Sequence, residues 1–368
     1  MENRTWVPFD DVANFMVEAF VKMGVPKSDA VICADVLIES DKRGIESHGV
    51  NRFKPIYIDR LEAKIQRPKT DIDTIKEGPT TAVLDANHGM GMVASHKAMT
   101  MAINKAKTYG MGMVVVRNST HYGIAGYYAT MATQAGMIGF TGTNARPSIA
   151  PTFGIEPMLG TNPFTVGLPT DEAFPFVLDC ATSITQRGKI EYFDKIHKDT
   201  PKGMVVGSDG KPKTDSHQIL SDLLNGEAAL APLGGIGEEL AGYKGYGYAT
   251  LVEVLSSALS AGNFLKALSG YDEDKNKKPY GLGHYFIAID PEAFMGLDVF
   301  KKTTGDILRA LRNSKKAPGE QRIYTAGEKE YIAHMHRQDR GVPFTEGVKE
   351  DFKTVKDMLD LDTVLPFE

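Results

Sequence analysis

Residues 112–143 read GMVVVRNSTHYGIAGYYATMATQAGMIGFTGT, and this stretch decides the fold. It opens with an apolar run typical of a buried strand, continues with helical spacing over 123–135, and ends in a second apolar run. A similar run at 80–86 (TTAVLDA) precedes a helical pattern at 93–108. This strand–helix–strand alternation predicts an α/β core in which some strands pair in parallel.

The rest of the chain adds two strands and several helices to this core. Strands are predicted at 175–180 (PFVLDC) and 283–290 (GHYFIAID). The stretch 195–245 is rich in Gly, Lys, Pro and Asp, which predicts loops over the core. Helices are predicted at 10–23, at 28–42 with Ser28 as its cap, from near Asn51 with Pro55 in the first turn, at 291–313 and at 328–360.

Composition sets limits on the class of protein. A chain of 368 residues predicts two or three lobes, and a net charge of −5 gives no electrostatic reason to expect nucleic acid. No apolar run approaches the ~20 residues that span a bilayer, and the start lacks the apolar segment of a signal peptide. The only cysteines, Cys33 and Cys180, form no CxxC motif or Cys/His cluster. We therefore expect a cytoplasmic protein without membrane contact, disulfides or a bound metal.

An α/β core invites a search for nucleotide-binding and hydrolytic motifs, and none of the familiar ones occurs. The sequence contains no GxGxxG, no GxxxxGK[ST], no HExxH and no GxSxG. The absence of these motifs disfavours Rossmann, P-loop, zincin and α/β-hydrolase interpretations.

The stretch DKRGIESHGVNR at 41–52 is the first candidate site. Ser47 can orient the His48 imidazole, and Arg52, four residues on, can bind a carboxylate through two N–H groups. A helix beginning near Asn51 would add positive potential there. The alternative, equally weighted from spacing alone, is a capped helix junction with solvent-facing polar groups.

Five further stretches place polar residues at predicted strand ends or helix starts, where ligands bind in open α/β sheets. His121 follows the strand at 112–118, although Asn118, Ser119 or Thr120 could simply cap a helix there. The loops 142–151 and 158–169 offer backbone amides, as ordinary turns also do. Asp179 ends a strand and suits a ribose hydroxyl or a helix cap, with Arg187 and Lys189 following. Lys244 lies among glycines ahead of a helix and suits a phosphate or carboxylate, or only solvent.

Five motifs in order resemble the malate/L-lactate dehydrogenase family that lacks a Rossmann fold, over roughly residues 8–360. They read RGIESHGVNR, THYGIAGYYATMATQAGMIG, LGTNPFTVGLP, VLDCATSITQRGKIE and LAGYKGYGYATLVEVLS. The resemblance implies an α/β, non-Rossmann, NAD(P)-binding mixed-sheet core with a helical lobe formed by the two chain ends, and a homodimer that completes the active site. We expect the lobe to comprise 1–75 with 315–368, and the core 76–314.

The resemblance also implies roles for residues of the site. Its SHG histidine, a proposed acid/base, falls on His48 with Ser47 beside it, and its carboxylate-binding arginine falls on Arg52. The HFG histidine, the proton acceptor in some members, falls on His121, which also contacts the cofactor. Thr161 is a further expected substrate-binding residue.

The cofactor segment of the family, typically Asp-Met-Ala-Thr-Ser, reads Asp-Cys-Ala-Thr-Ser at 179–183, with Cys180 replacing the methionine. A PGE-like motif corresponds to 325–328, where Ala326 replaces the proline. Besides His121, the expected cofactor-binding residues are Ala145, Asp179, Cys180, Ala181, Arg187, Lys244, Gly327 and Glu328.

These roles imply hydride transfer between NAD or NADP, with NAD favoured, and a small 2-hydroxy acid, while a histidine takes the hydroxyl proton. Sequence does not decide whether His48 or His121 does so; we favour His48. By resemblance around GGIGEELAGYKGYGYA, malate and oxaloacetate are the expected pair. The second carboxylate of malate needs another cation, for which the candidates are Lys42, Arg43, Arg146 and Arg187.

Other functions stay open at this point. Within the family, L-lactate or sulfolactate oxidation and reduction of a cyclic-imine carboxylate are the alternatives. From a different class, the chain could be a catalytically silent nucleotide-binding scaffold, against which the joint presence of Ser47, His48, Arg52, His121 and Lys244 argues.

Overall fold

The computed structural model describes residues 4–367 and builds its core on one seven-stranded sheet. Only β3 and β4 are parallel neighbours, and all other neighbouring strands are antiparallel. The predicted α/β class with a mixed sheet is therefore confirmed. The strands, in order across the sheet, are β2 (Asp73–Glu77), β3 (Thr81–Asp85), β4 (Met111–Ser119), β10 (Leu282–Ile289), β5 (Ile138–Thr143), β6 (Phe164–Leu168) and β7 (Phe176–Cys180).

Strand β10 separates β4 from β5, the two strands predicted within residues 112–143. It lies between β4 and β5 and runs antiparallel to both, so β4 and β5 share a direction without touching. The first five residues of β10 are buried, as expected for the centre of a sheet covered on both faces.

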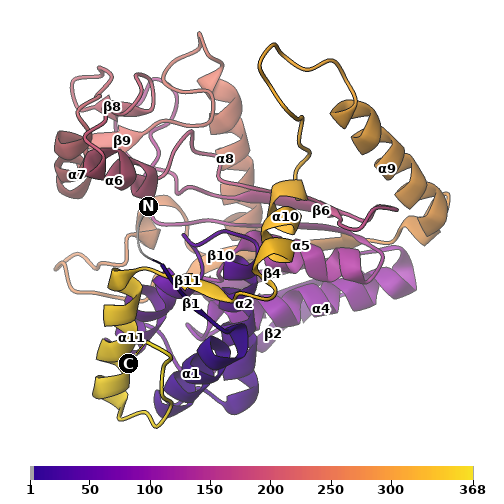
Figure 1. Cartoon of the computed structure of the whole chain (residues 1–368), viewed down its shortest axis with the longest axis horizontal. Helices are drawn as coiled ribbons and strands as arrows, with labels where there is room; N and C mark the ends of the chain where they lie inside the picture. The colour runs from indigo at the N-terminus through magenta and orange to yellow at the C-terminus, as the bar shows by residue number, and fades with distance from the viewer. Residues whose placement is uncertain (1–3, 368) are drawn as a thin grey trace.

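Helices cover both faces of this sheet (Figure 1). On one face α4 (Gly91–Tyr109) and α5 (Ala125–Gln134) share an apolar cluster with Val114, Val116 and Phe286. On the other face, Val115 and Tyr285 pack against Val252 of α8 (Gly242–Ser257). The alternation of Val114, Val115 and Val116 between the two clusters follows from the two-residue period of a strand.

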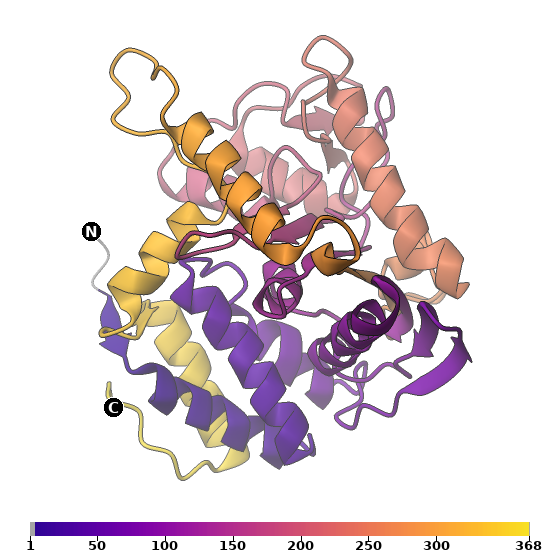
Figure 2. The same cartoon turned by 90° about the vertical axis from the view of Figure 1, so that its right-hand side faces the viewer.

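The two ends of the chain form the expected helical lobe. Helices α1 (Phe9–Lys22), α2 (Lys27–Lys42) and α11 (Glu346–Leu359) share one buried cluster, and β1 (Thr5–Val7) pairs with β11 (Val342–Phe344). Figure 2 shows the N-terminal (indigo) and C-terminal (yellow) helices side by side. Helix α2 begins one residue before Ser28, with Pro26 at the cap position instead. The lobe boundaries at 75 and 315 stay a prediction.

The stretch 195–245 has long turns but also regular elements that were not predicted. These are the end of α6 (Arg187–Lys195), α7 (Ser216–Asn225) and a ribbon of β8 (Val205–Gly207) with β9 (Ala228–Leu230). They surround an apolar cluster of their own that includes Ile190, Val205 and Ile219.

The run after β10 forms α9 (Leu297–Arg312), and the tail forms α10 (Glu328–Arg337) ahead of β11. Over residues 4–367, no helix combines the length and apolar character needed to cross a membrane.

Candidate active site

His48 lies in a tight turn directly after α2. Gly44 adopts a φ of +76°, and the His48 N–H donates to the Ile45 carbonyl at 3.0 Å. The buried Asp41 carboxyl accepts the Val50 N–H at 2.8 Å, and a Cβ on Gly49 would overlap that carboxyl. The hydrogen bond from Val50 to Asp41 thus fixes this turn against the last turn of α2, and the position of the turn sets the direction of the His48 side chain.

The helix predicted from Asn51 is irregular. A 3₁₀ turn at Val50–Arg52 leads into a π-helical turn at Phe53–Ile58, and only Asp59–Glu62 is α-helix (α3). Pro55 lies inside the π-helical turn, and so the expectation of a regular helix with Pro55 in its first turn was wrong. Proline has no N–H to donate and disfavours a continuous α-helical ladder. Arg52 lies in the 3₁₀ turn, Tyr57 in the π-helical turn and Arg60 in α3.

Ser47, His48 and Arg52 contact one another as the motif suggests. Ser47 Oγ lies 2.9 Å from His48 Nδ1, and Arg52 Nε donates to the Ser47 carbonyl at 2.6 Å. Burial, and then the positive charge of Arg52, lower the pKa of His48 to about 4. The imidazole is consequently neutral near pH 7.

His121 follows β4 and stacks against His48, with ring centroids 5.9 Å apart and planes inclined by 16°. Its Nδ1 lies 2.7 Å from the Tyr57 hydroxyl and accepts the Gly123 N–H at 3.2 Å. Burial lowers the pKa of His121 well below its usual value, and the charges of His48, Arg60 and Arg52 lower it further. A backbone N–H can only donate, so Nδ1 carries no proton and the neutral ring carries its proton on Nε2.

The residues ahead of His121 do not cap a helix, since α5 begins only at Ala125. Ser119 Oγ lies 2.7 Å from Nε2 of the buried His284, and Thr120 Oγ1 accepts the Gly91 N–H at 2.9 Å. Both side chains hold the backbone of the His121 segment against the core.

Asp179, at the end of β7, lines a cavity of about 850 Å³ together with Arg43 and Gly327. The Asp179 carboxylate accepts the Gly126 N–H at 2.6 Å and the Thr165 hydroxyl at 3.0 Å, while burial raises its pKa. The lining also includes Ile45 and Ile124, each three residues from one of the two histidines. The cavity reaches the two histidine segments through these isoleucines, and neither His48 nor His121 is among its lining residues.

A cluster of loops beyond β6 and β7 brings other predicted residues together. The Ala145 N–H donates to Asn162 Oδ1 at 3.1 Å, and the Thr182 N–H donates to the Thr161 carbonyl at 2.9 Å. The Thr182 carbonyl in turn accepts the Leu233 N–H, against which the first turn of α8 packs closely. Lys244 lies within that first turn, not ahead of the helix as predicted, and is exposed.

Other predicted residues face away from this centre or have partners of their own. Arg187 pairs with Glu191 on α6 at 2.9 Å, and Lys42 and Arg43 both pair with Glu39. The buried Glu328 carboxylate accepts the Thr325 N–H at 3.1 Å and pairs with Arg322. Cys180 directs its Sγ toward the Phe164 carbonyl, 3.9 Å away, and Ala181 is partly buried next to it.

Arg60 also lies near the histidines, and the sequence did not predict it as a site residue. It is partly buried, with its guanidinium carbon 4.4 Å from the centre of the Tyr280 ring, and its charge acts on His121. Its position eight residues after Arg52, about two helical turns, was the only available signal.

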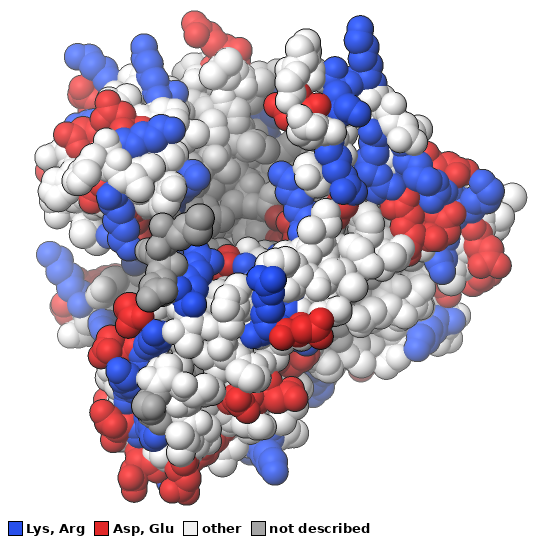
Figure 3. All heavy atoms as spheres, viewed as in Figure 1, with Lys and Arg blue, Asp and Glu red and all other residues white. Residues whose placement is uncertain are grey.

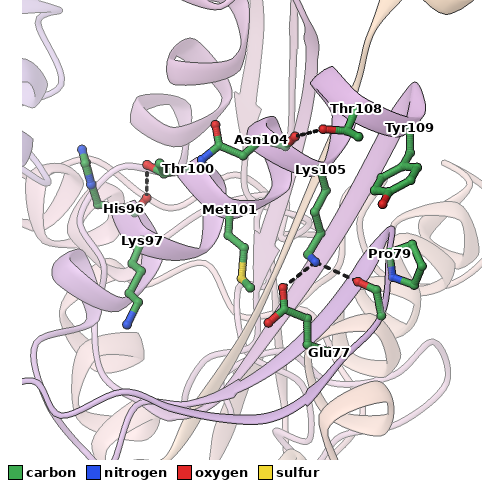
Figure 4. A pocket seen from close by; sticks show the side chains of 11 residues that line it. Glu77, Pro79, His96, Lys97, Thr100, Met101, Asn104, Lys105, Thr108 and Tyr109 are labelled. Atoms are coloured by element: carbon green, nitrogen blue, oxygen red, sulfur yellow. Dashed lines mark hydrogen bonds and ion pairs between the residues drawn. The ribbon is translucent and has the colours of Figure 1, made fainter.

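Elsewhere on the surface, a hollow of about 720 Å³ lies against α4 (Figure 4). Its buried cation, Lys105, already donates to Glu77 and to the Gly78 carbonyl, both at 2.8 Å. A depression appears in Figure 3 between the lobe holding β8 and β9 and the side of the molecule formed by α9 and its following loop, where Lys and Arg side chains gather. In residues 4–367, no group of three His, Cys, Asp or Glu side chains is placed to hold a metal.

The malate/L-lactate dehydrogenase family profile matches residues 7–353. The malate dehydrogenase of Pyrococcus horikoshii is 41% identical over 96% of this chain and 95% of its own. The L-sulfolactate dehydrogenase of Methanocaldococcus jannaschii is 39% identical over 94% and 95% of the two chains. The crystal structure of malate dehydrogenase from Entamoeba histolytica superposes with a TM-score of 0.94 at 45% identity, covering 99% and 100% of the chains.

Proposed function

Because this chain belongs to the malate/L-lactate dehydrogenase family and is therefore a dehydrogenase, we propose that it interconverts malate and oxaloacetate with a nicotinamide cofactor. One observation carries the proposal: two stacked, neutral imidazoles lie beside Arg52, a guanidinium without a carboxylate partner among residues 4–367. Relatives named malate dehydrogenase at 41% identity favour malate over other 2-hydroxy acids.

Arg52 binds the carboxylate next to the reacting carbon. A guanidinium can hold a carboxylate through two parallel N–H bonds, and this directs the carbinol carbon of the substrate. Orientation of this kind contributes several kcal/mol to a barrier reduction. Thr161 lies in the loop cluster beyond β6 and completes the expected substrate contacts.

His121 donates a hydrogen bond to the reacting oxygen and does not take its proton. The Gly123 N–H and the Tyr57 hydroxyl both face Nδ1, which supports an Nε2–H that points away from them. A neutral donor of this kind polarises a carbonyl, or steadies the developing negative charge on an alcohol oxygen.

His48 is the base in the oxidation of malate. When Nδ1 of His48 donates to Ser47 Oγ at 2.9 Å, its Nε2 is left as an unprotonated acceptor. In the oxidation, the substrate O–H bond breaks toward His48, and in the reduction the same nitrogen returns the proton. A nicotinamide held beside this carbon would supply the acceptor for the hydride of the carbinol C–H bond.

The cavity lined by Asp179, Arg43 and Gly327 suits a nicotinamide cofactor. Its volume of about 850 Å³ lies in the range of small-molecule sites, and it combines the Asp179 carboxylate with the Arg43 guanidinium. Asp179, Gly327 and Lys244 would hold the cofactor, together with the backbone near Ala145 and Thr182. We favour NAD because Arg187, the residue suited to a 2′-phosphate, pairs with Glu191 instead.

We also propose a cytoplasmic homodimer. Both cysteines are free thiols, as is usual in a reducing compartment. Helix α8 exposes Tyr248, Leu251 and Val254 at 45 to 52%, an apolar face suited to a second copy. Sedimentation velocity would give the oligomeric state.

The test compares His48→Gln with His121→Gln in both reaction directions. We expect His48→Gln to lower kcat by about 10²- to 10⁴-fold, the usual contribution of a general base, and His121→Gln to cost less. Near-wild-type kcat in His48→Gln with loss of orders of magnitude in His121→Gln would contradict the assignment. Assays of oxaloacetate, pyruvate, sulfopyruvate and piperideine-2-carboxylate with NADH and NADPH separate malate from the other substrates. Cofactor binding without turnover of any of them would favour the silent scaffold.

A further inference from the structure

Arg60 brings a second positive charge to the histidine pair. Burial and the charge of Arg146 lower the pKa of Arg60, while Tyr280 and Tyr57 act in the opposite sense. The charges of Arg60 and Arg52 act together on both His121 and Tyr57. Arg60 follows Tyr57 by three residues, and the Tyr57 hydroxyl lies 2.7 Å from His121 Nδ1, so both guanidinium groups belong to segments that contact the histidine pair.

Among the described residues, neither guanidinium has a carboxylate partner. Within residues 4–367, every other arginine that is partly buried forms an ion pair with Asp or Glu, whereas Arg52 and Arg60 form none. Arg52 donates only to the Ser47 carbonyl, and Arg60 contacts the Tyr280 ring. A partly buried charge without a partner is costly, because it loses hydration without a compensating anion.

The contact with Tyr280 leaves Arg60 able to bind. The guanidinium carbon lies over the ring, 4.4 Å from its centre, which is a cation–π contact and not a hydrogen bond. The N–H donors of a guanidinium point outward in its plane and stay available for an anion. Arg146, exposed and close enough to act on Arg60, adds positive potential at the same side.

We infer that Arg60 binds the distal acid group of the substrate while Arg52 binds the carboxylate beside the reacting carbon. The site then selects 2-hydroxy acids that carry a second anionic group, a carboxylate or a sulfonate, over monoacids such as lactate. This inference rests on the proposed function, because it assigns the second anion site of the same substrate. It replaces the earlier candidates Lys42, Arg43 and Arg187, whose charges are already paired with glutamates.

The experiment compares wild type with Arg60→Gln and Arg60→Lys, using oxaloacetate, sulfopyruvate and pyruvate. We expect Arg60→Gln to lower kcat/KM for oxaloacetate about 100-fold, mainly through KM, and to change that for pyruvate by less than about threefold. Arg60→Lys keeps the charge but loses the paired N–H donors of the guanidinium. Its kcat/KM for oxaloacetate should lie between the values of wild type and Arg60→Gln. Sulfopyruvate should lose kcat/KM in Arg60→Gln as oxaloacetate does, because the inferred site binds a distal sulfonate as well as a carboxylate. A response of sulfopyruvate like that of pyruvate would contradict the sulfonate part of the inference. Arg67→Gln, the same change at an exposed arginine, is the control.

Binding provides a readout that does not need turnover. Malate should raise the thermal midpoint of wild type more than lactate does, and Arg60→Gln should abolish that difference. Equal losses for diacid and monoacid, or an unchanged preference in Arg60→Gln, would overturn the inference. Wild type that binds malate in this way but transfers no hydride would instead refute the proposed function and leave the anion site standing.

Discussion

At the residue scale, the two imidazoles differ in their surroundings although they stack in parallel. Nδ1 of His121 faces two donors, Gly123 N–H and Tyr57 O–H, whereas Nδ1 of His48 faces one serine hydroxyl that can donate or accept. A local motif reading could find both histidines but could not assign their tautomers. Tyr57 is 64 positions from His121 in sequence, and only the folded chain brings them together.

Tyr57 is predicted to position His121. Tyr57→Phe removes one donor to Nδ1, and we expect kcat for oxaloacetate reduction to fall about tenfold with little change in KM, the effect of one lost hydrogen bond. The ¹⁵N NMR shift of His121 Nδ1 should change because that nitrogen loses one of its two donors, while the Gly123 N–H keeps the ring in its Nε2–H tautomer. Tyr128→Phe also loses a buried hydrogen bond, to the Tyr122 carbonyl, but should leave the His121 spectrum unchanged. An unaltered Nδ1 shift and an unaltered kcat in Tyr57→Phe would contradict the prediction.

At the scale of an element, the end of α2 and the turn that follows are joined by a buried hydrogen bond and act as one structural unit. Asp41 holds the Val50 N–H, and Gly49 leaves room for that contact because it has no side chain. Burial raises the pKa of Asp41 to about 8, while the Val50 hydrogen bond acts in the opposite direction. The folded protein therefore binds this proton more tightly than the unfolded chain does.

The raised pKa predicts a pH-dependent stability. The contribution of Asp41 is complete below about pH 4 and is lost as the pH rises toward about 8, at up to about 1.4 kcal/mol per pH unit. Asp41→Asn keeps an oxygen that accepts the Val50 N–H and does not ionise. The difference in free energy of unfolding between Asp41→Asn and wild type should therefore shift in favour of the variant as the pH rises. Urea unfolding between about pH 5 and pH 9 measures the difference. Asp10→Asn, at an exposed site on α1, should show no such trend; a constant difference for Asp41→Asn would refute the prediction.

At the scale of the whole molecule, the C-terminal helix supports a site formed near the N-terminus. Phe352 of α11 stacks on Phe15 of α1 with ring centroids 4.9 Å apart, and lies 5.3 Å from Phe53, the residue after Arg52. Packing between the chain ends therefore reaches the segment that carries Arg52, Tyr57 and Arg60.

Phe352→Ala should consequently affect both stability and substrate binding. Removal of a fully buried phenyl ring is expected to cost about 3–5 kcal/mol of unfolding free energy, and to raise KM for oxaloacetate as Phe53 loses support. Denaturant unfolding and steady-state kinetics check the two effects. Phe294→Ala is the matched control, because that side chain is 72% exposed. A loss of stability without any change in KM would show that packing in the lobe does not affect substrate binding, and would contradict the prediction.

Sequence by itself determined the class of the core, most of its helices and strands, and the motif residues His48, Arg52, His121 and Asp179. These depend on periodicity and short spacings, which act over a few residues. Tertiary structure alone decided that β10 lies between β4 and β5, that the end of β7 shares a cavity with Gly327, and that Arg60 has no anionic partner. Those outcomes depend on which distant segments share a low-dielectric interior, where an unpaired charge or an orphan donor carries a high free-energy cost.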